Sequence, residues 1–250
     1  GAALALLAVI PWLVVRALCF RLHNTSHRGI RFRFHGASGE SYRVLAGFGL
    51  LSILSFGALF PLFVQRQTRF VLGNAAFGQS RFAFEAPAGA FYRVFALALV
   101  LLVAILAPVG WGLGGVFDRV AGAGAEEQPW LGTAMGLLGG YLVALAVVVP
   151  FVQARLHNLT WNAARLGPHR FQSDQALPSL FWLLFTNTLA TIATLGLFRP
   201  FAVVRRARYR AEHMTLLPGG SLDDFAADAG ASASATGEEM AEVFDFDFGL

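Results

Sequence analysis

The sequence contains no lysine, a single cysteine and few charged residues. Its nineteen strongly basic residues are therefore all arginine, and charged residues make up 14% of the chain, whereas soluble domains contain about 25%. Cys19 has no second cysteine for an intramolecular disulfide, and alone it cannot build a structural zinc site. Hydrophobic residues make up 56% of the chain and the mean hydropathy is +0.59. This composition argues against a soluble protein.

Recognised catalytic motifs are also missing. The sequence has no G-x-S-x-G elbow, no phosphate-binding P-loop and no H-E-x-x-H pair. His23 and His27 have the four-residue spacing of metal ligands on a helix, but no acidic residue lies near them in the sequence. We therefore expect no enzymatic activity, no cofactor and no metal site.

Long apolar runs are what the sequence does contain. Five of them are long enough to consider as membrane-crossing helices, which take roughly 20 residues. Arginines gather in most of the intervening stretches, and beside apolar runs a basic chain fits anionic lipid headgroups better than nucleic acid. We therefore predict an all-α polytopic membrane protein with apolar segments at about 2–20, 44–64, 91–117, 131–152 and 177–204.

The segments repeat at fixed spacings. A shift of 50 residues places Pro11 and Arg16 on Pro61 and Arg66, and a shift of 139 relates the two halves of the chain. Several matches in one ungapped register indicate duplication. We predict an internally duplicated helical bundle with blocks at 1–115 and 116–215, followed by an acidic, largely disordered cytoplasmic tail at 216–250. The longest set matched by the shift of 139 places Ser52, Ser55, Gly57, Pro61, Arg66 and Arg69 on Thr191, Thr194, Gly196, Pro200, Arg205 and Arg208.

Basic amphipathic segments follow the apolar ones and lead into short alternating runs. RFRF at 31–34 and RFAF at 81–84 alternate charged or small residues with phenylalanine. Alternation of this kind is typical of strands, because successive side chains of a strand point to opposite faces. We therefore predict short strands at the membrane interface.

The charge distribution conflicts with five straight crossings. Successive basic loops would then lie on opposite sides, although arginine-rich loops favour the cytoplasmic side. The conflict disappears if 44–64 and 177–204 are re-entrant or broken helices that enter and leave on one side. Glycine, proline and hydroxyl residues in both segments permit such a break where protein or water satisfies the backbone. Five straight helices with an imperfect charge rule are the alternative.

Polar residues in these two interrupted segments are candidates for a path through the membrane. Polar side chains inside a bilayer are costly unless they are paired or hydrated, although serine and threonine can bond to a carbonyl of their own helix. Asn187 has no such easy partner, and we interpret it as a buried functional or helix-bridging group. The candidates for the polar path are Asn187, Thr188, Thr191, Thr194, Ser52 and Ser55.

Arginines at the ends of the apolar segments form the second group of candidates. The planar guanidinium binds phosphate through two parallel hydrogen bonds, which suits an anion or lipid-headgroup site. The alternative is that these arginines mark the cytoplasmic side and contact lipid phosphates without specificity. The candidates are Arg16, Arg66, Arg155, Arg205, Arg206 and Arg208.

Several motifs occur together in this chain. They are RFRFHG at 31–36, HNLTWN at 157–162, HRF at 169–171, TLGLFRPF at 194–201, VRRARYRAEH at 204–213 and the ending VFDFDFGL. With them the chain resembles, over essentially its whole length, the YjgN-like DUF898 family of bacterial inner-membrane proteins. The resemblance implies a multi-pass protein of the bacterial inner membrane, and it implies no established activity.

Two functional hypotheses follow. The first is a transporter or channel-like protein whose polar path runs along the broken segments. The second is a noncatalytic membrane scaffold that binds anionic lipid or a partner protein through its arginine face and acidic tail. We expect membrane lipids as partners, another protein or a second copy of the chain as a further candidate, and no nucleic acid.

Overall fold

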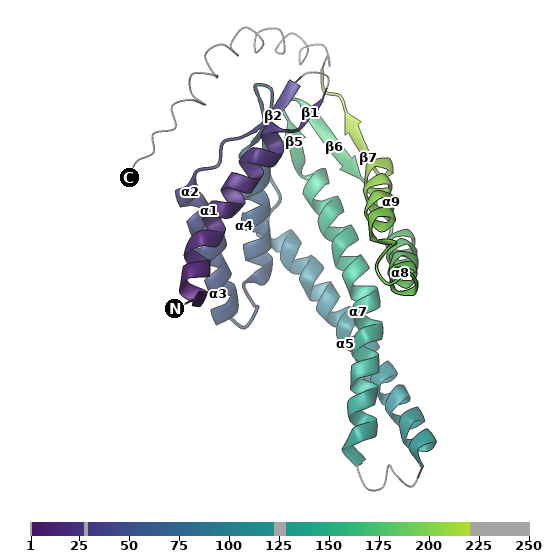
Figure 1. Ribbon diagram of the computed structural model, residues 1–250. Coiled ribbons are helices and arrows are strands. Elements are labelled where there is room, and N and C mark those ends of the chain that lie inside the picture. The colour runs from purple at the N-terminus through teal and green to yellow at the C-terminus, as the bar shows by residue number, and fades with distance from the viewer. Residues whose placement is uncertain (1, 28–29, 123–128, 221–250) are drawn as a thin grey trace. The chain divides into compact units, whose positions relative to one another are not determined.

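The structure is a computed structural model that describes residues 2–27, 30–122 and 129–220 (Figure 1). The chain divides into two compact units. One comprises Gly1–Ala86, Ala163–Phe171 and Leu216–Leu250, and the other comprises Pro87–Asn162 and Gln172–Thr215. Most of the predicted acidic tail, 221–250, lies outside the described residues. The predicted duplication blocks concern sequence similarity and stay a prediction.

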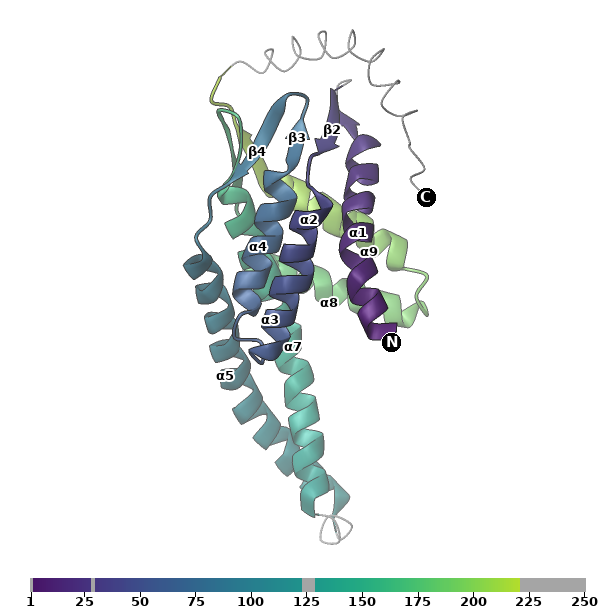
Figure 2. The ribbon, with the colours of Figure 1, turned by 90° about the vertical axis from the view of Figure 1, so that its left-hand side faces the viewer.

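The first unit contains a cluster of helices and most of the strands. Its helix core is small: Val15, Val44 and Phe70 are buried together, with Cys19, Phe34 and Val71 packed against them. In both views α3 and α4 lie side by side, joined by a tight turn (Figures 1 and 2). The helices are α1 (Ala2–His23), α2 (Ser38–Ser41), the π-helix η1 (Tyr42–Phe48), α3 (Gly49–Leu54) and α4 (Phe60–Gly73).

The strands form one seven-stranded sheet in the order β1-β2-β3-β4-β5-β6-β7. The pairs from β1–β2 to β5–β6 are all antiparallel. The register places Phe32 opposite Phe77, with ring centres 4.7 Å apart, and Phe82 stacks on Phe171 at 5.9 Å. The strands are β1 (Ser26–His27), β2 (Ile30–Phe34), β3 (Ala75–Phe77), β4 (Ser80–Phe84), β5 (Ala164–Leu166), β6 (His169–Ser173) and β7 (Met214–Leu217).

The second unit is built on two long helices that pack along each other. Glycine allows their backbones to approach closely: a Cβ at Gly140 would lie 2.7 Å from the backbone nitrogen of Gly110, and one at Gly136 would clash with the oxygen of Gly110. Small residues at a helix interface are typical of membrane helices. The helices of this unit are α5 (Ala88–Ala121), α7 (Pro129–Asn162), α8 (Leu177–Ala193) and α9 (Arg199–Glu212).

Helices α5 and α7 are long and apolar enough to cross a membrane. The most apolar 18-residue stretches of Ala88–Val120 and Trp130–Asn162 have mean hydropathies of 2.6 and 2.2, and only 17% and 22% of these stretches are buried. Trp111 and Val120 are 87% and 82% exposed. Apolar surface of this extent on a soluble monomer is rare. The two helices therefore indicate association with a membrane.

The predicted all-α polytopic fold is wrong. The described residues contain a seven-stranded sheet. Among them, two helices rather than five are long and apolar enough to cross a membrane. The alternating runs at 31–34 and 81–84 do lie in strands, β2 and β4. The sheet escaped prediction because its strands have two to five residues and pair across long stretches of sequence. At 17 residues α8 extends about 25 Å, less than the roughly 30 Å of a bilayer core.

Both interrupted segments are broken by the same kind of turn. Phe56 and Gly57 have φ values of 51° and 87°, and Leu195 and Gly196 have 49° and 94°. Positive φ is easy for glycine and costly for leucine or phenylalanine, so each turn stores some backbone strain. A break is therefore present in each segment, and its re-entry into a membrane stays a prediction.

Candidate functional site

The buried amide of Asn187 connects α8 to α9. This side chain is only 4% exposed, and its Nδ2 donates to the carbonyl of Ala202 at 3.3 Å. Its Oδ1 accepts a hydrogen bond from Nη1 of Arg205 at 2.7 Å. The structure thus places Asn187 as a bridge between helices, with both ends of the amide paired.

The other polar-path candidates are mostly satisfied within their own segments. Thr191 donates to the carbonyl of Asn187 at 2.6 Å, Thr194 to that of Ala190 at 2.7 Å, and Ser55 to that of Ser52 at 3.0 Å. These are bonds to the preceding turn, which hydroxyls make without any ligand. Ser52 is buried, and its Oγ has no hydrogen-bond partner among the described residues. The candidates on α8 are therefore not brought together to line one path.

The candidate arginines fall into three groups by their contacts. Three lie over aromatic rings on their own or a neighbouring helix: Arg16 on Trp12 at 5.6 Å, Arg66 on Phe48 at 5.7 Å and Arg155 on Phe151 at 5.7 Å. Two are paired, Arg205 with Asn187 and Arg208 with Glu212 at 2.8 Å. Arg206 makes neither an ion pair nor a cation–π contact within the part of the chain that the structure describes.

Arg206 lines a groove formed by α7, α8 and α9. The groove has a volume of about 350 Å³, and most of its wall is aliphatic or aromatic. Its three polar side chains are Gln153, Thr188 and Arg206, one from each helix. The wall residues follow helical spacing, with Leu142, Leu145, Ala146 and Val149 on α7 and Phe181, Leu184 and Phe185 on α8.

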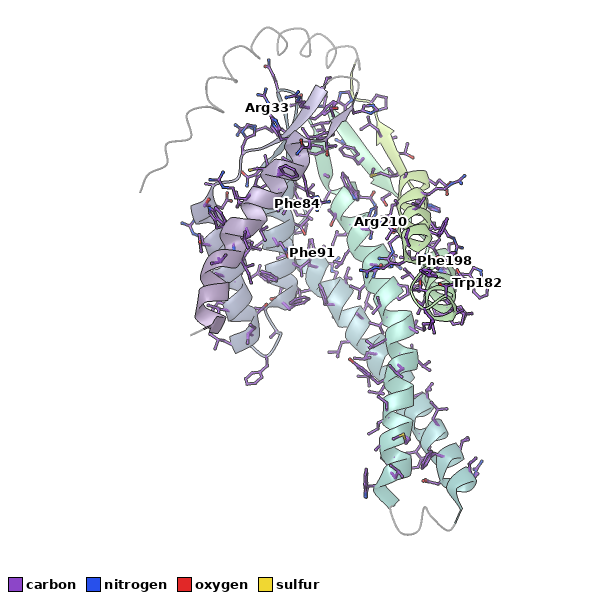
Figure 3. All side chains as sticks on the ribbon, viewed as in Figure 1. Arg33, Phe84, Phe91, Trp182, Phe198 and Arg210 are labelled. Carbon is purple, nitrogen blue, oxygen red and sulfur yellow. The ribbon has the colours of Figure 1, made fainter. Side chains whose placement is uncertain are left out.

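Positive charge concentrates at this face of α9. The pKa of the Arg210 guanidinium is lowered from its ordinary value by partial burial and by the neighbouring charge of Arg206. Figure 3 shows Arg210 on α9, with Trp182 on α8 and Phe198 in the turn between the two helices. An anion bound between or beside these two guanidinium groups would offset the repulsion between their charges.

A hydrogen-bonded clamp holds the chain just before α8, and the sequence reasoning missed it. Asn158 Oδ1 accepts from Ser173 Oγ at 2.8 Å and from the amide of Gln175 at 2.9 Å, while its Nδ2 donates to the carbonyl of Gln175 at 3.0 Å. Asn162 pairs in the same way with the amide and carbonyl of Ser173, at 2.6 and 3.2 Å. The two amides satisfy backbone groups of Ser173 and Gln175 immediately before α8 begins at Leu177.

Tyr209 completes this clamp from α9. Its hydroxyl is 3.2 Å from both the amide and the carbonyl of Ala176, accepting from the first and donating to the second. Its ring is buried with Ala154 and Leu180. The signal in the sequence was the four-residue spacing of Asn158 and Asn162, which puts both amides on one helix face.

The two broken segments also form the same bonds at equivalent positions. Leu59 donates its amide to Ser55 Oγ at 3.0 Å, and Phe198, 139 residues later, donates to Thr194 Oγ1 at 3.0 Å. The pair Phe48–Arg66 corresponds by the same shift to Asn187–Arg205. One segment thus anchors its arginine on a ring and the other on an amide.

The two long apolar helices indicate association with a membrane, and the described residues also form a small antiparallel sheet. The model of one family, described as bacterial protein of unknown function (DUF898), matches residues 1–243 of this chain. The chain therefore belongs to the DUF898 family. Searches among curated proteins and among solved structures found no match.

Proposed function

We propose that this protein is a noncatalytic, multi-pass protein of the bacterial inner membrane that binds anionic lipid. In this proposal α5 and α7 cross the bilayer, and the two helical hairpins α3–α4 and α8–α9 dip into it from the cytoplasmic side. Their arginines then lie among the lipid phosphates. The shared turns support an origin by internal duplication.

The exposure of the two hairpin tips carries the proposal. Phe56 is fully exposed at 101%, and Leu195, at the equivalent position of the second turn, is 95% exposed. Ile53 and Ile192, also 139 residues apart, are 72% and 68% exposed. An apolar tip followed by arginines matches a segment that buries its apolar end in acyl chains and leaves its cations at the headgroups.

The charge sequence along α9 supports the same orientation. After Arg199, the first residue of α9, come Phe201, Val203 and Val204, which are 62–66% exposed, and the other four arginines of the helix follow them. Each arginine near an anionic surface contributes about 1 kcal/mol of attraction. A partner protein is the other candidate for this surface, but the absence of charge from the two exposed turns, 55–59 and 194–198, favours lipid.

Transport is the second candidate function. It is favoured by one observation, that Thr188 of the predicted polar path lines the groove together with Arg206. It is weakened by the hydroxyls of Thr191, Thr194 and Ser55, which bond to their own backbone. Release of a trapped ion from vesicles containing the protein would favour transport over lipid binding.

Lipid-dependent thermal stability tests the lipid-binding proposal. The full chain, purified in a neutral detergent, is titrated with phosphatidylglycerol or with phosphatidylcholine. We expect a rise in Tm with the anionic lipid alone, since a ligand that binds only the folded state stabilises it. The rise should shrink in high salt and in the triple variant Arg205→Gln, Arg206→Gln, Arg208→Gln. Equal shifts with both lipids would contradict the proposal.

A further inference from the structure

The groove between α7, α8 and α9 joins an apolar wall to a cationic end. Along α7 it extends from Leu142 to Gln153, which is about 16 Å at the rise of an α-helix. On α7, the lining is apolar as far as Pro150 and polar only at Gln153. The groove is therefore amphipathic along its length.

The polar groups of α7 and α9 lie toward the same end of the groove. Tyr209 packs on Ala154, and Gln153 immediately precedes Ala154 on α7. Arg206 lies three residues before Tyr209, and residues at that spacing share a helix face. Arg206 and Gln153, which both line the groove, therefore lie toward the end that is nearest the C-terminus of α7.

Two features at this end are incompletely satisfied by the protein. The Oε1 of Gln153 is buried and has no hydrogen-bond partner among the described residues. Arg206 has no carboxylate partner within those residues, and its charge acts on Arg210. A buried acceptor without a donor is a costly arrangement, and the neighbouring charges of Arg206 and Arg210 repel each other.

We infer that this groove binds one phospholipid of the phosphatidylglycerol type, with an acyl chain along Leu142–Val149 and the phosphate on Arg206. The phosphate compensates the charge of Arg206 and Arg210, and a headgroup hydroxyl can donate to Gln153. This inference rests on the proposed membrane function, but it names one saturable site in place of a charged surface. Charge complementarity selects a lipid over an uncharged amphiphile, and the apolar wall selects a lipid over free phosphate.

The test is native mass spectrometry of the full chain in neutral detergent with dioleoylphosphatidylglycerol. We expect a single bound lipid that persists in high salt, where binding through exposed arginines alone is screened. Ala146→Trp fills the groove with a large side chain without changing charge and should remove the bound lipid. Val143→Trp is the matched control, because Val143 is on α7, is 43% exposed and does not line the groove; it should retain the lipid.

Arg206→Gln should weaken binding about tenfold or more, since hydrogen bonds to a charged group are the strong ones. Arg165→Gln, which removes an arginine of β5 that is paired with Glu85, should leave the affinity within about twofold. Folding of every variant is checked by circular dichroism and by elution as a single species.

Three results would overturn the inference. They are lipid retained equally by Ala146→Trp and Val143→Trp, equal binding of dioleoylphosphatidylcholine, and equal competition by glycerol 3-phosphate, which has the headgroup phosphate and no chains. If the protein prefers anionic lipid but the Ala146→Trp variant still retains it, the proposed lipid-binding function stands and the groove site is refuted. If the protein shows no preference for anionic lipid, both proposals are refuted.

Discussion

Arg205 donates a 2.7 Å hydrogen bond to Oδ1 of Asn187 across the turn that separates α8 from α9. Asn187 is 4% exposed, whereas the arginine lies on an exposed stretch of α9. The bond therefore joins a buried amide of one helix to a cation at the surface of the next. It joins the two arms of the second helical hairpin, α8 and α9.

Removing this amide should destabilise the second unit. Asn187→Leu removes the partner of Arg205 and of the Ala202 carbonyl, and we expect a loss of about 1–3 kcal/mol in the free energy of unfolding. Asn187→Asp keeps an oxygen for the guanidinium and should recover much of that loss. Denaturant unfolding in detergent micelles measures both; equal losses in the two variants would show that the bond to Arg205 is unimportant.

Opening the clamp at the start of α8 should cost a similar amount. Asn158→Ala leaves the backbone amide and carbonyl of Gln175 without their partner and removes one of the two partners of the Ser173 hydroxyl, which keeps His157. We expect a loss of about 1–3 kcal/mol and faster amide hydrogen exchange at 173–177. Asn24→Ala is the control, because Asn24 is exposed and its side chain bonds only to the carbonyl of Phe20.

The hydroxyl of Tyr209 can be tested without disturbing its packing. Tyr209→Phe keeps the ring against Ala154 and Leu180 and removes both bonds to Ala176. We expect a loss of about 1 kcal/mol, measured by the same unfolding experiment. Tyr141→Phe should have almost no effect, since Tyr141 is 45% exposed on α7; a similar effect of both substitutions would argue against the clamp.

Two glycines in the long helices should respond in opposite ways to alanine. Gly140→Ala places a methyl group 2.7 Å from the backbone of Gly110, so α5 and α7 must separate at a cost of about 1–3 kcal/mol. A Cβ at Gly115 meets no atom within 4 Å, and Gly115→Ala should stabilise the helix by about 0.5–1 kcal/mol. Thermal unfolding distinguishes them; two losses of equal size would mean that the helices are not packed at Gly140.

The sequence predicted the breaks, the short strands and the apolar helices because each has a local signal. Gly57, Gly196 and the prolines after them signalled the turns, and alternation signalled β2 and β4. The complete sheet also depends on pairing between β4 and β5, which lie some eighty residues apart in the sequence. No periodicity in the sequence reveals such pairing. Asn187 stands out in the sequence as a polar residue without an easy partner on its own helix. The structure pairs it with Arg205, which the sequence groups with the lipid-headgroup candidates.

The clamp and the groove depend on three helices meeting, which a linear pattern does not show. Asn158 and Asn162 lie in the HNLTWN motif at 157–162, which contributes to the family resemblance but does not predict the clamp. The sequence does not single out Gln153, because a glutamine near arginines is common in proteins of any function. The structure makes Gln153 a candidate because it lines the same groove as Arg206 and because its buried Oε1 has no hydrogen-bond partner among the described residues.

Insertion of the hairpin tips into the bilayer is the central claim, and the depth of a spin label tests it most directly. A Cys19→Ala background receives Leu195→Cys at the tip or Arg208→Cys on the basic half of α9. After reconstitution in vesicles, collision with oxygen and with a water-soluble nickel complex reports the depth of each label. We predict that the label at 195 is reached by oxygen and shielded from nickel, and that the label at 208 shows the reverse. Equal exposure of both labels to nickel would place the tip in water and contradict the account.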